Sequence, residues 1–132
     1  MIYCKEFSYT PKIKTLEGYE SHSESKTFKD VLVGFIQIEE KDSEKLKSTE
    51  DKLLKNLKWA AKKNNTTKIL LHSFAHLSES KAPPDISKQI FDKVEKRLHN
   101  SGIECAQTPF GYFLDLKLEA PGYSLARIFK DL

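Results

Sequence analysis

The stretch Val31–Ile38 reads VLVGFIQI, a short and nearly continuous apolar run that is rich in β-branched residues. A strand with one face in water alternates between apolar and polar residues, whereas a strand that is covered on both faces stays apolar throughout. We therefore expect Val31–Ile38 to form a central strand of a sheet. The sequence around it predicts the elements that surround such a strand.

Two amphipathic helices are predicted downstream of this strand. The first spans roughly Lys47 to Lys63, because leucines and alanines recur at helical spacing while lysines and acids fill the positions between them. The second begins near Pro84, which suits a first helical turn, and ends before Gly102, which suits the position just past a helix end. Its apolar positions are Ile86, Ile90, Phe91, Val94 and Leu98.

Four other segments have the composition of strands: Ile2–Tyr9, Lys68–Ser73, Ile103–Ala106 and Tyr112–Leu118. Pro11 marks either the end of the first of these or an edge position, because proline cannot donate to a sheet ladder. The polar stretch 12–30 reads as a long loop or hairpin-like excursion, and Thr108–Gly111 as a turn. Pro121-Gly122 favours a type II turn, so residues 123–129 are expected to form the returning strand of a hairpin.

This order of elements predicts the α/β class. With 132 residues the chain fits one domain, which we expect to cover residues 1–132. Strands that alternate with two helices predict a mixed β-sheet with both amphipathic helices packed on one face. No internal repeat divides the chain.

The composition is that of a folded domain with little bias toward one kind of partner. Hydrophobic residues make up 39% and charged residues 31% of the chain. No apolar run approaches the ~20 residues that a bilayer span needs, so we expect a cytoplasmic protein without a membrane partner. The net charge of +3 permits RNA binding without indicating it. The lysines of the first helix read as a solvated face, with RNA contact as the alternative.

Several kinds of reactive site lack support in the sequence. Neither a glycine-rich phosphate loop nor a GxSxG nucleophile motif is present. Cys4 and Cys105 lie far apart without metal-ligand spacing, and we expect reduced, buried thiols. His72 and His76 are four residues apart, but a strand that runs into a loop does not bring such positions to one face, and no third ligand is near. We expect no metal and no cofactor.

The loop His72–Asp85, HSFAHLSESKAPPD, is the candidate for a ligand site. It places His76, Ser78 and Ser80 at the carboxyl end of a buried strand, where α/β sheets usually form their ligand crevices. From these residues alone the chain reads as an α/β domain with a pocket of undefined chemistry. His76 fits a packing role there as well as a catalytic one.

Three segments carry a resemblance to a known family: FAHLS at Phe74–Ser78, PFGYF at Pro109–Phe113 and PGYSLAR at Pro121–Arg127. Together they resemble the N-terminal editing domain of archaeal threonyl-tRNA synthetases, in which the corresponding pieces read approximately PFAHLS, APFGYYK and GHPLAELSR. FKDVLVGFIQIEE at Phe28–Glu40 is similar to the family's strand EEVLVAFISVEK. The resemblance spans nearly the whole chain in a consistent order.

This resemblance implies a fold like that of D-aminoacyl-tRNA deacylases and a proofreading function. The expected reaction is the hydrolysis of serine wrongly attached to the 3'-terminal adenosine of tRNA(Thr). A pocket gains only about 1 to 3 kcal/mol from one methylene-sized difference, so a second site that admits the smaller amino acid improves discrimination. The implied partners are the acceptor end of tRNA(Thr) and the catalytic part of the synthetase. A monomer and a homodimer both remain open.

The resemblance also implies roles for individual residues. By position, the catalytic residues fall on His76 and Tyr112. The expected substrate-binding residues are Phe74, Ala75, Ser78, Phe110, Gly111 and Phe113. The small side chain of Ala75 would let the substrate approach the main chain there.

Three positions depart from the family pattern. The family's lysine falls on Leu114, its second tyrosine on Phe113 and its glutamate on Arg127. Leucine can neither donate a hydrogen bond nor activate water, and losing one such group typically costs on the order of 10² to 10⁴ in rate. Lys117 is no substitute, because strand alternation points it to the face opposite residue 114. An active deacylase and a non-catalytic module that only binds or positions the tRNA acceptor end are therefore both open.

The length leaves no room for a synthetase catalytic core or an anticodon-binding domain within these residues. We expect either a part of a longer synthetase or a free-standing relative that acts in trans.

Overall fold

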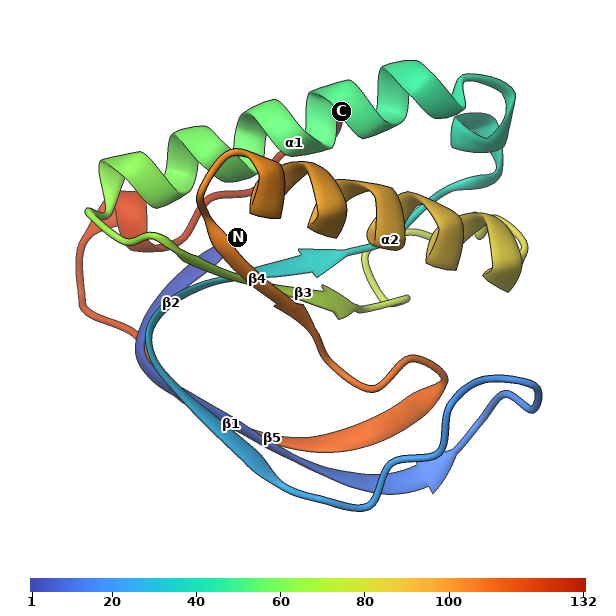
Figure 1. Ribbon diagram of the computed structural model, residues 1–132, viewed down its shortest axis with the longest axis horizontal. Helices are drawn as coiled ribbons and strands as arrows, with labels where there is room; N and C mark the ends of the chain where they lie inside the picture. The colour runs from blue at the N-terminus through green and yellow to red at the C-terminus, as the bar shows by residue number, and fades with distance from the viewer.

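β2, Lys26–Ile36, is the central strand of a five-stranded sheet in the computed structural model, which describes residues 1–132 (Figure 1). The strand order is β4-β3-β2-β1-β5, with β1 at Ile2–Lys14, β3 at Lys68–Ser73, β4 at Glu104–Gln107 and β5 at Tyr112–Glu119. β2, β3 and β4 are parallel, whereas β1 pairs antiparallel with both β2 and β5. The sheet is therefore mixed, as the sequence predicted.

Both helices cover the same face of this sheet, which confirms the predicted layers (Figure 1). α1 spans Leu46–Lys63 and α2 spans Pro84–Asn100, each within one residue of the predicted start. Pro84 lies in the first turn of α2, and Gly102 has the positive φ of +78° that glycine tolerates after a helix end. Their buried apolar residues form the larger core with the facing side of β2 and β3.

The apolar run in β2 contributes to two cores, as a strand covered on both faces should. Leu32 and Ile36 face the helices, whereas Val31 and Val33 belong to a smaller core on the opposite side. This second core also contains Cys4, Phe7, Tyr9 and Leu70. β1, β2 and β5 curve away from the helices around it (Figure 1).

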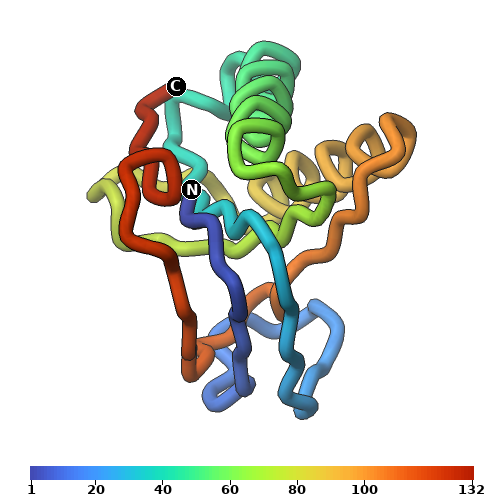
Figure 2. The backbone as a smooth tube through the Cα atoms, turned by 90° about the vertical axis from the view of Figure 1, so that its left-hand side faces the viewer, coloured from blue at the N-terminus to red at the C-terminus, as the bar shows by residue number.

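The predicted hairpin at the C-terminal end of the chain is wrong. Ser124–Ala126 forms a short 3-10 helix, η2, and Arg127 makes only an isolated bridge to Ile2. Met1 and Ile128 then exchange backbone hydrogen bonds, so the last segment runs beside the start of β1 (Figure 2). Contacts with the residue just after α1 explain the difference, because they offer this segment partners other than β5.

Asn64, which follows the last residue of α1, supplies those contacts. Its side-chain nitrogen donates to the carbonyl of Leu125 at 2.9 Å, and its side-chain oxygen accepts from the hydroxyl of Tyr123 at 2.7 Å. Asn64 is itself buried, so these bonds replace water.

The polar stretch 12–30 is a hairpin, but the flanking strands are longer than predicted. β1 continues through Pro11 to Lys14, and β2 already begins at Lys26. β1 pairs with β2 only as far as Tyr9, so Pro11 has no β2 neighbour, and the register with β5 shifts just after it. Pro11 therefore takes the edge position that the sequence allowed, and pairing with β5 carries the strand onward.

The two cysteines and the two helices agree with the sequence analysis. Cys4 and Cys105 are free and buried, as predicted, and burial raises the pKa of the Cys4 thiol to about 11. Burial, with a smaller effect of Glu95, raises the pKa of Cys105 to about 12. Neither helix is both long and apolar enough to span a bilayer.

Candidate functional site

A cavity of about 520 Å³ opens where the parallel strands β2 and β3 end. We call it the strand-end cavity. Its wall comes from the ends of β2 and β3, the loop after β3, the start of α2, the turn before β5, the first half of β5 and the beginning of the β1–β2 loop. This is the position at which open α/β sheets commonly bind ligands, and the volume suits a small organic group.

The two segments that the sequence singled out meet at this cavity. Residues 74–76 of the loop after β3 and residues 109–113, which form the turn before β5 and its first two positions, both line it. Seven of the eight expected site residues are therefore brought together: Phe74, Ala75, His76, Phe110, Gly111, Tyr112 and Phe113. The eighth, Ser78, does not line the strand-end cavity.

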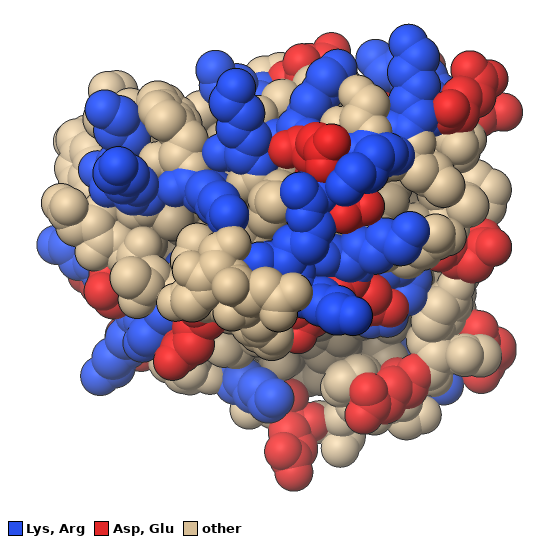
Figure 3. All heavy atoms as spheres, turned by 45° about the horizontal axis from the view of Figure 1, so that its top comes forward, with Lys and Arg blue, Asp and Glu red and all other residues tan.

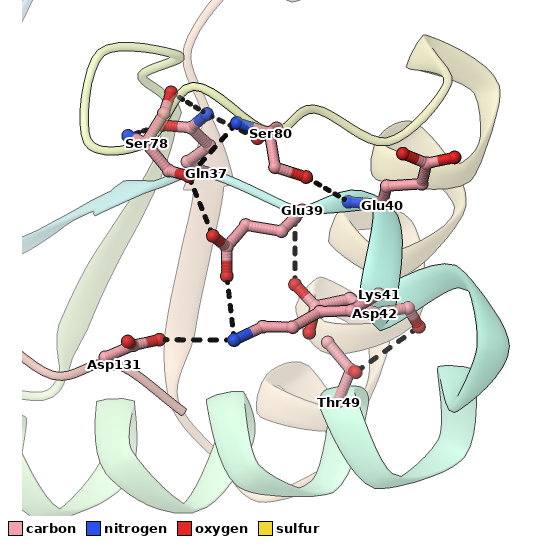
Figure 4. A network of polar contacts seen from close by, with 9 residues as sticks. All are labelled: Gln37, Glu39, Glu40, Lys41, Asp42, Thr49, Ser78, Ser80 and Asp131. Atoms are coloured by element: carbon pink, nitrogen blue, oxygen red, sulfur yellow. Dashed lines mark hydrogen bonds and ion pairs between the residues drawn. The ribbon is translucent and has the colours of Figure 1, made fainter.

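The loop after β3 is clamped by one side chain, Gln37 (Figure 4). Its oxygen accepts from the backbone N–H groups of Leu77 and Ser78, both at 2.7 Å. Its nitrogen donates to the backbone carbonyls of Ser78 and Ser80, both at 2.8 Å. Gln37 thus satisfies four backbone groups of an irregular loop, which holds the loop in one conformation.

Ser78 belongs to this clamp. Its hydroxyl donates to a carboxylate oxygen of Glu39 at 2.7 Å, while the other oxygen of Glu39 lies 3.3 Å from Lys41 (Figure 4). The hydrogen bond from Ser78, followed by the contact with Lys41, lowers the pKa of Glu39 below its usual value. Further along, the N–H of Ala82 donates to the carbonyl of Ile38 at 2.9 Å. The loop is therefore fixed on both sides of residue 81.

Gly111 and Tyr112 tie the tip of the β1–β2 hairpin to the cavity. Gly111 has a φ of +79°, and a Cβ there would lie 2.9 Å from the Cβ of Leu16, so only glycine fits. Its carbonyl accepts from the N–H of Thr15 at 2.7 Å. The hydroxyl of Tyr112 accepts from the N–H of His22 at 3.1 Å, which leaves its own proton free to donate.

Aromatic rings pack around His76 and on the opposite wall of the cavity. The ring of Phe74 packs edge-on against His76, with centroids 5.0 Å apart, and also against Phe35 at 5.4 Å. On the other side Phe110 is buried against Phe91 and Tyr19. His76 itself is exposed, so its ring nitrogens are accessible to a ligand.

The three departures from the family pattern differ in where they lie. Leu114 and Phe113 line the strand-end cavity, whereas Arg127 does not and instead donates to the carbonyl of Pro121 at 2.7 Å. Lys117 is also absent from the lining. The only lysine, arginine or carboxylate that lines the cavity is Lys81, which is exposed and has no ion-pair or hydrogen-bond partner in the protein.

Sequence reasoning missed three residues of this site: Gln37, Lys81 and His72. Gln37 had one usable signal, because it is the only polar residue in VLVGFIQI. His72 lines the cavity but lies in a strand, and Lys81 lies in a loop with no pattern. No group of three or more histidine, cysteine or acidic side chains is arranged to hold a metal ion.

A larger hollow of about 1050 Å³ lies beside the strand-end cavity. It is bordered by α1, the C-terminal segment and the exposed side of β5, and Ser78 lines this hollow. Phe74 and Leu116 border both spaces. The motif residues concentrate around the smaller space, which we therefore take as the candidate site.

The chain is similar to known proteins over its whole length. Residues 1–132 match the family model described as the archaea-specific editing domain of threonyl-tRNA synthetase. The threonine–tRNA ligase of Thermococcus kodakarensis is 31% identical over 135 residues, which cover 100% of this chain and 22% of the relative. That of Methanopyrus kandleri is 26% identical over 128 residues, covering 96% of this chain and 20% of the relative. The chain thus spans about a fifth of the length of these relatives.

Proposed function

Because the chain belongs to the archaea-specific editing-domain family of threonyl-tRNA synthetase, we propose that it hydrolyses the ester that joins serine to the 3'-terminal adenosine of tRNA(Thr). One observation carries this proposal. The FAHLS loop and the PFGYF turn, about thirty residues apart in the chain, line one cavity at the strand ends. Such convergence supports a shared ligand better than either motif alone.

The groups at the cavity suit ester hydrolysis. This reaction needs an oriented water and a donor where the carbonyl oxygen becomes an oxyanion. The exposed imidazole of His76 can bind that water, and the free hydroxyl proton of Tyr112 can be donated to the oxyanion. The clamped loop holds the backbone near Ala75 in place, which favours close and reproducible contact with the substrate.

The proposed partners follow from the relatives of this chain. Those relatives are named threonine–tRNA ligases, and this chain matches about a fifth of their length. We propose that the domain receives the acceptor end of tRNA(Thr) after a ligase catalytic part has charged it.

The direct test is incubation of the chain with seryl-tRNA(Thr) and, as the matched control, threonyl-tRNA(Thr). We expect the seryl ester to be hydrolysed well above the buffer rate and the threonyl ester much less. His76→Ala should lower the rate by about 10² or more, because it removes the imidazole that orients the reacting water in this proposal. A seryl ester that survives as long with the chain as in buffer, with the tRNA intact, rejects the proposal.

A second function is favoured by Leu114. An apolar side chain lines the cavity where the family pattern has a lysine, which favours a module that only binds or positions the tRNA end. Leu114→Lys separates the two functions, with Leu114→Met as the control for altered packing. Hydrolysis that appears only in Leu114→Lys identifies the native chain as a binding module, whereas native hydrolysis that is insensitive to the change supports the deacylase.

A further inference from the structure

His72 is a buried polar residue of the strand-end cavity to which no motif gives a role. It lies in β3, is only 5% exposed and lines the cavity. Its Nδ1 is 2.8 Å from the hydroxyl oxygen of Thr108. Thr108 is equally buried, and its N–H donates to the carbonyl of Leu71 at 2.9 Å. The partner of Nδ1 is therefore itself anchored to β3.

The other ring nitrogen, Nε2, makes no hydrogen bond within the protein. No fully buried side-chain nitrogen or oxygen in the protein lacks a hydrogen-bond partner. Nδ1 makes the one hydrogen bond of this side chain, so Nε2 has no protein partner and is not fully buried. The strand-end cavity is the space that His72 borders. Nε2 is therefore accessible from the cavity.

The orientation of this ring is restricted by packing as well as by Thr108. Phe35 stands perpendicular to it, with centroids 5.1 Å apart, and Phe74 lies at 5.9 Å. Burial lowers the pKa of His72 to about 4, so the imidazole is uncharged near neutral pH. A neutral imidazole that has one nitrogen engaged presents a single, fixed hydrogen-bonding atom on the other.

We propose that His72, oriented by Thr108, is a specificity-determining residue whose Nε2 hydrogen-bonds the side-chain hydroxyl of the seryl group. The inference rests on the proposed function for the identity of the ligand. His72 is a buried part of the lining, whereas His76 and Phe113 are exposed, so the amino acid at the very end of the tRNA is the piece that reaches it. A site built around a substrate hydroxyl discriminates against a ligand without one, because the buried partner is then left unpaired.

Binding of non-hydrolysable analogues tests this inference independently of catalysis. The probes are the amide analogues of 3'-seryl-adenosine and 3'-alanyl-adenosine, which differ by the hydroxyl. We expect the wild-type chain to bind the seryl analogue more tightly. His72→Asn retains a polar atom near the Nδ1 position but lacks Nε2, and it should weaken seryl binding roughly 3- to 10-fold while leaving alanyl binding unchanged.

His72→Gln is the conservative rescue, because its amide can reach the Nε2 position, and it should keep most of the preference. Thr108→Ser and Thr108→Val form a second pair that leaves the histidine in place. Serine should preserve the preference for the seryl analogue and valine should reduce it, so the inference stays testable if His72→Asn does not fold.

Three results overturn the inference: His72→Asn weakens the binding of both analogues equally, the wild type binds the two analogues with equal affinity, or neither analogue binds. The first result would point to a contact with the adenosine or to a purely structural role. Hydrolysis of seryl-tRNA(Thr) is measured separately. If the chain prefers the seryl analogue but hydrolyses no seryl-tRNA(Thr), the role of His72 stands and the deacylase function is rejected. If it hydrolyses seryl-tRNA(Thr) but shows no preference for the seryl analogue, the deacylase function stands and the role of His72 is rejected.

Discussion

Gln37 holds the loop of the candidate site in place and also lines the strand-end cavity. Its amide bonds four backbone groups between residues 77 and 80, which lie about forty positions away in the chain. Each of those groups would otherwise depend on water. The conformation of the FAHLS loop therefore depends on a side chain that lies just past the end of the neighbouring strand β2.

Replacing this clamp should loosen the loop without unfolding the sheet. Under the proposed deacylase function, we expect Gln37→Leu to lower kcat/KM for seryl-tRNA(Thr) by about tenfold or more, because a small misplacement of catalytic groups is costly. Amide hydrogen exchange at residues 77–82 should rise at the same time. Gln37→Glu keeps the acceptor and loses the donor, so its effect should be intermediate. Unchanged exchange in Gln37→Leu would contradict the role of the clamp.

The buried His72 also predicts a dependence of stability on pH. Its folded-state pKa of about 4 lies below the unfolded value near 6.5, so the unfolded chain binds a proton first as the pH falls. The neutral imidazole therefore contributes its full share to the free energy of unfolding above pH 6.5. This contribution declines toward pH 4, by about 3 kcal/mol in total. Urea unfolding of the wild type and His72→Gln between pH 7 and pH 4 measures the difference. Parallel curves for the two proteins would show that His72 titrates normally.

At the scale of elements, composition and periodicity were enough to predict the central strand, both helices and the parallel strands β3 and β4. Those segments depend on local patterns: an apolar run, a helical repeat, Pro84 at one end and Gly102 after the other. Residues 123–129 are not determined by a local pattern, because their conformation depends on Asn64, some sixty positions earlier. A turn signal at Pro121-Gly122 could not reveal that partner.

The candidate site also contains some residues that local sequence motifs reveal and others that only the folded structure reveals. FAHLS and PFGYF were recognisable as motifs, and seven of the eight predicted residues meet at one cavity. The contact of His72 with Thr108 spans 36 positions, so it exists only once β3 and the segment after β4 lie side by side. Contacts of this range have no local signature in a sequence.

Replacing Asn64 tests how much its side chain stabilises the C-terminal segment. Its side chain makes hydrogen bonds to Ala60, Tyr123 and Leu125 and is buried. Asn64→Ala should lower the free energy of unfolding by about 1 to 3 kcal/mol, because the carbonyl of Leu125 and the hydroxyl of Tyr123 lose a partner. Tyr123→Phe removes only one of these bonds and should cost less. Equal effects of the two variants in urea titrations would assign the stabilisation to the tyrosine bond alone.

At the scale of the whole molecule, positive charge is widespread but only a little of it lies at the site. Lysines and arginines are scattered with acids over the face that contains the helices (Figure 3). Several are paired within the protein, including Lys47 with Asp51 and Lys88 with Asp92. The strand-end cavity, in contrast, has one unpaired cation in its wall, Lys81. Under the proposed function, its ammonium group is the cation of the cavity wall that can meet a phosphate of an entering tRNA end.

This distribution predicts which lysine controls the salt dependence of tRNA binding. Each phosphate contact to a single strand adds about 0.7 to the slope of log affinity against log salt concentration. Lys81→Gln should therefore weaken tRNA(Thr) binding and reduce that slope by about one contact. Lys62→Gln removes an exposed lysine of α1 outside the cavity and is the matched control. A slope that falls in Lys62→Gln and stays constant in Lys81→Gln would place the tRNA on the helices, and would count against the strand-end cavity as the entry point.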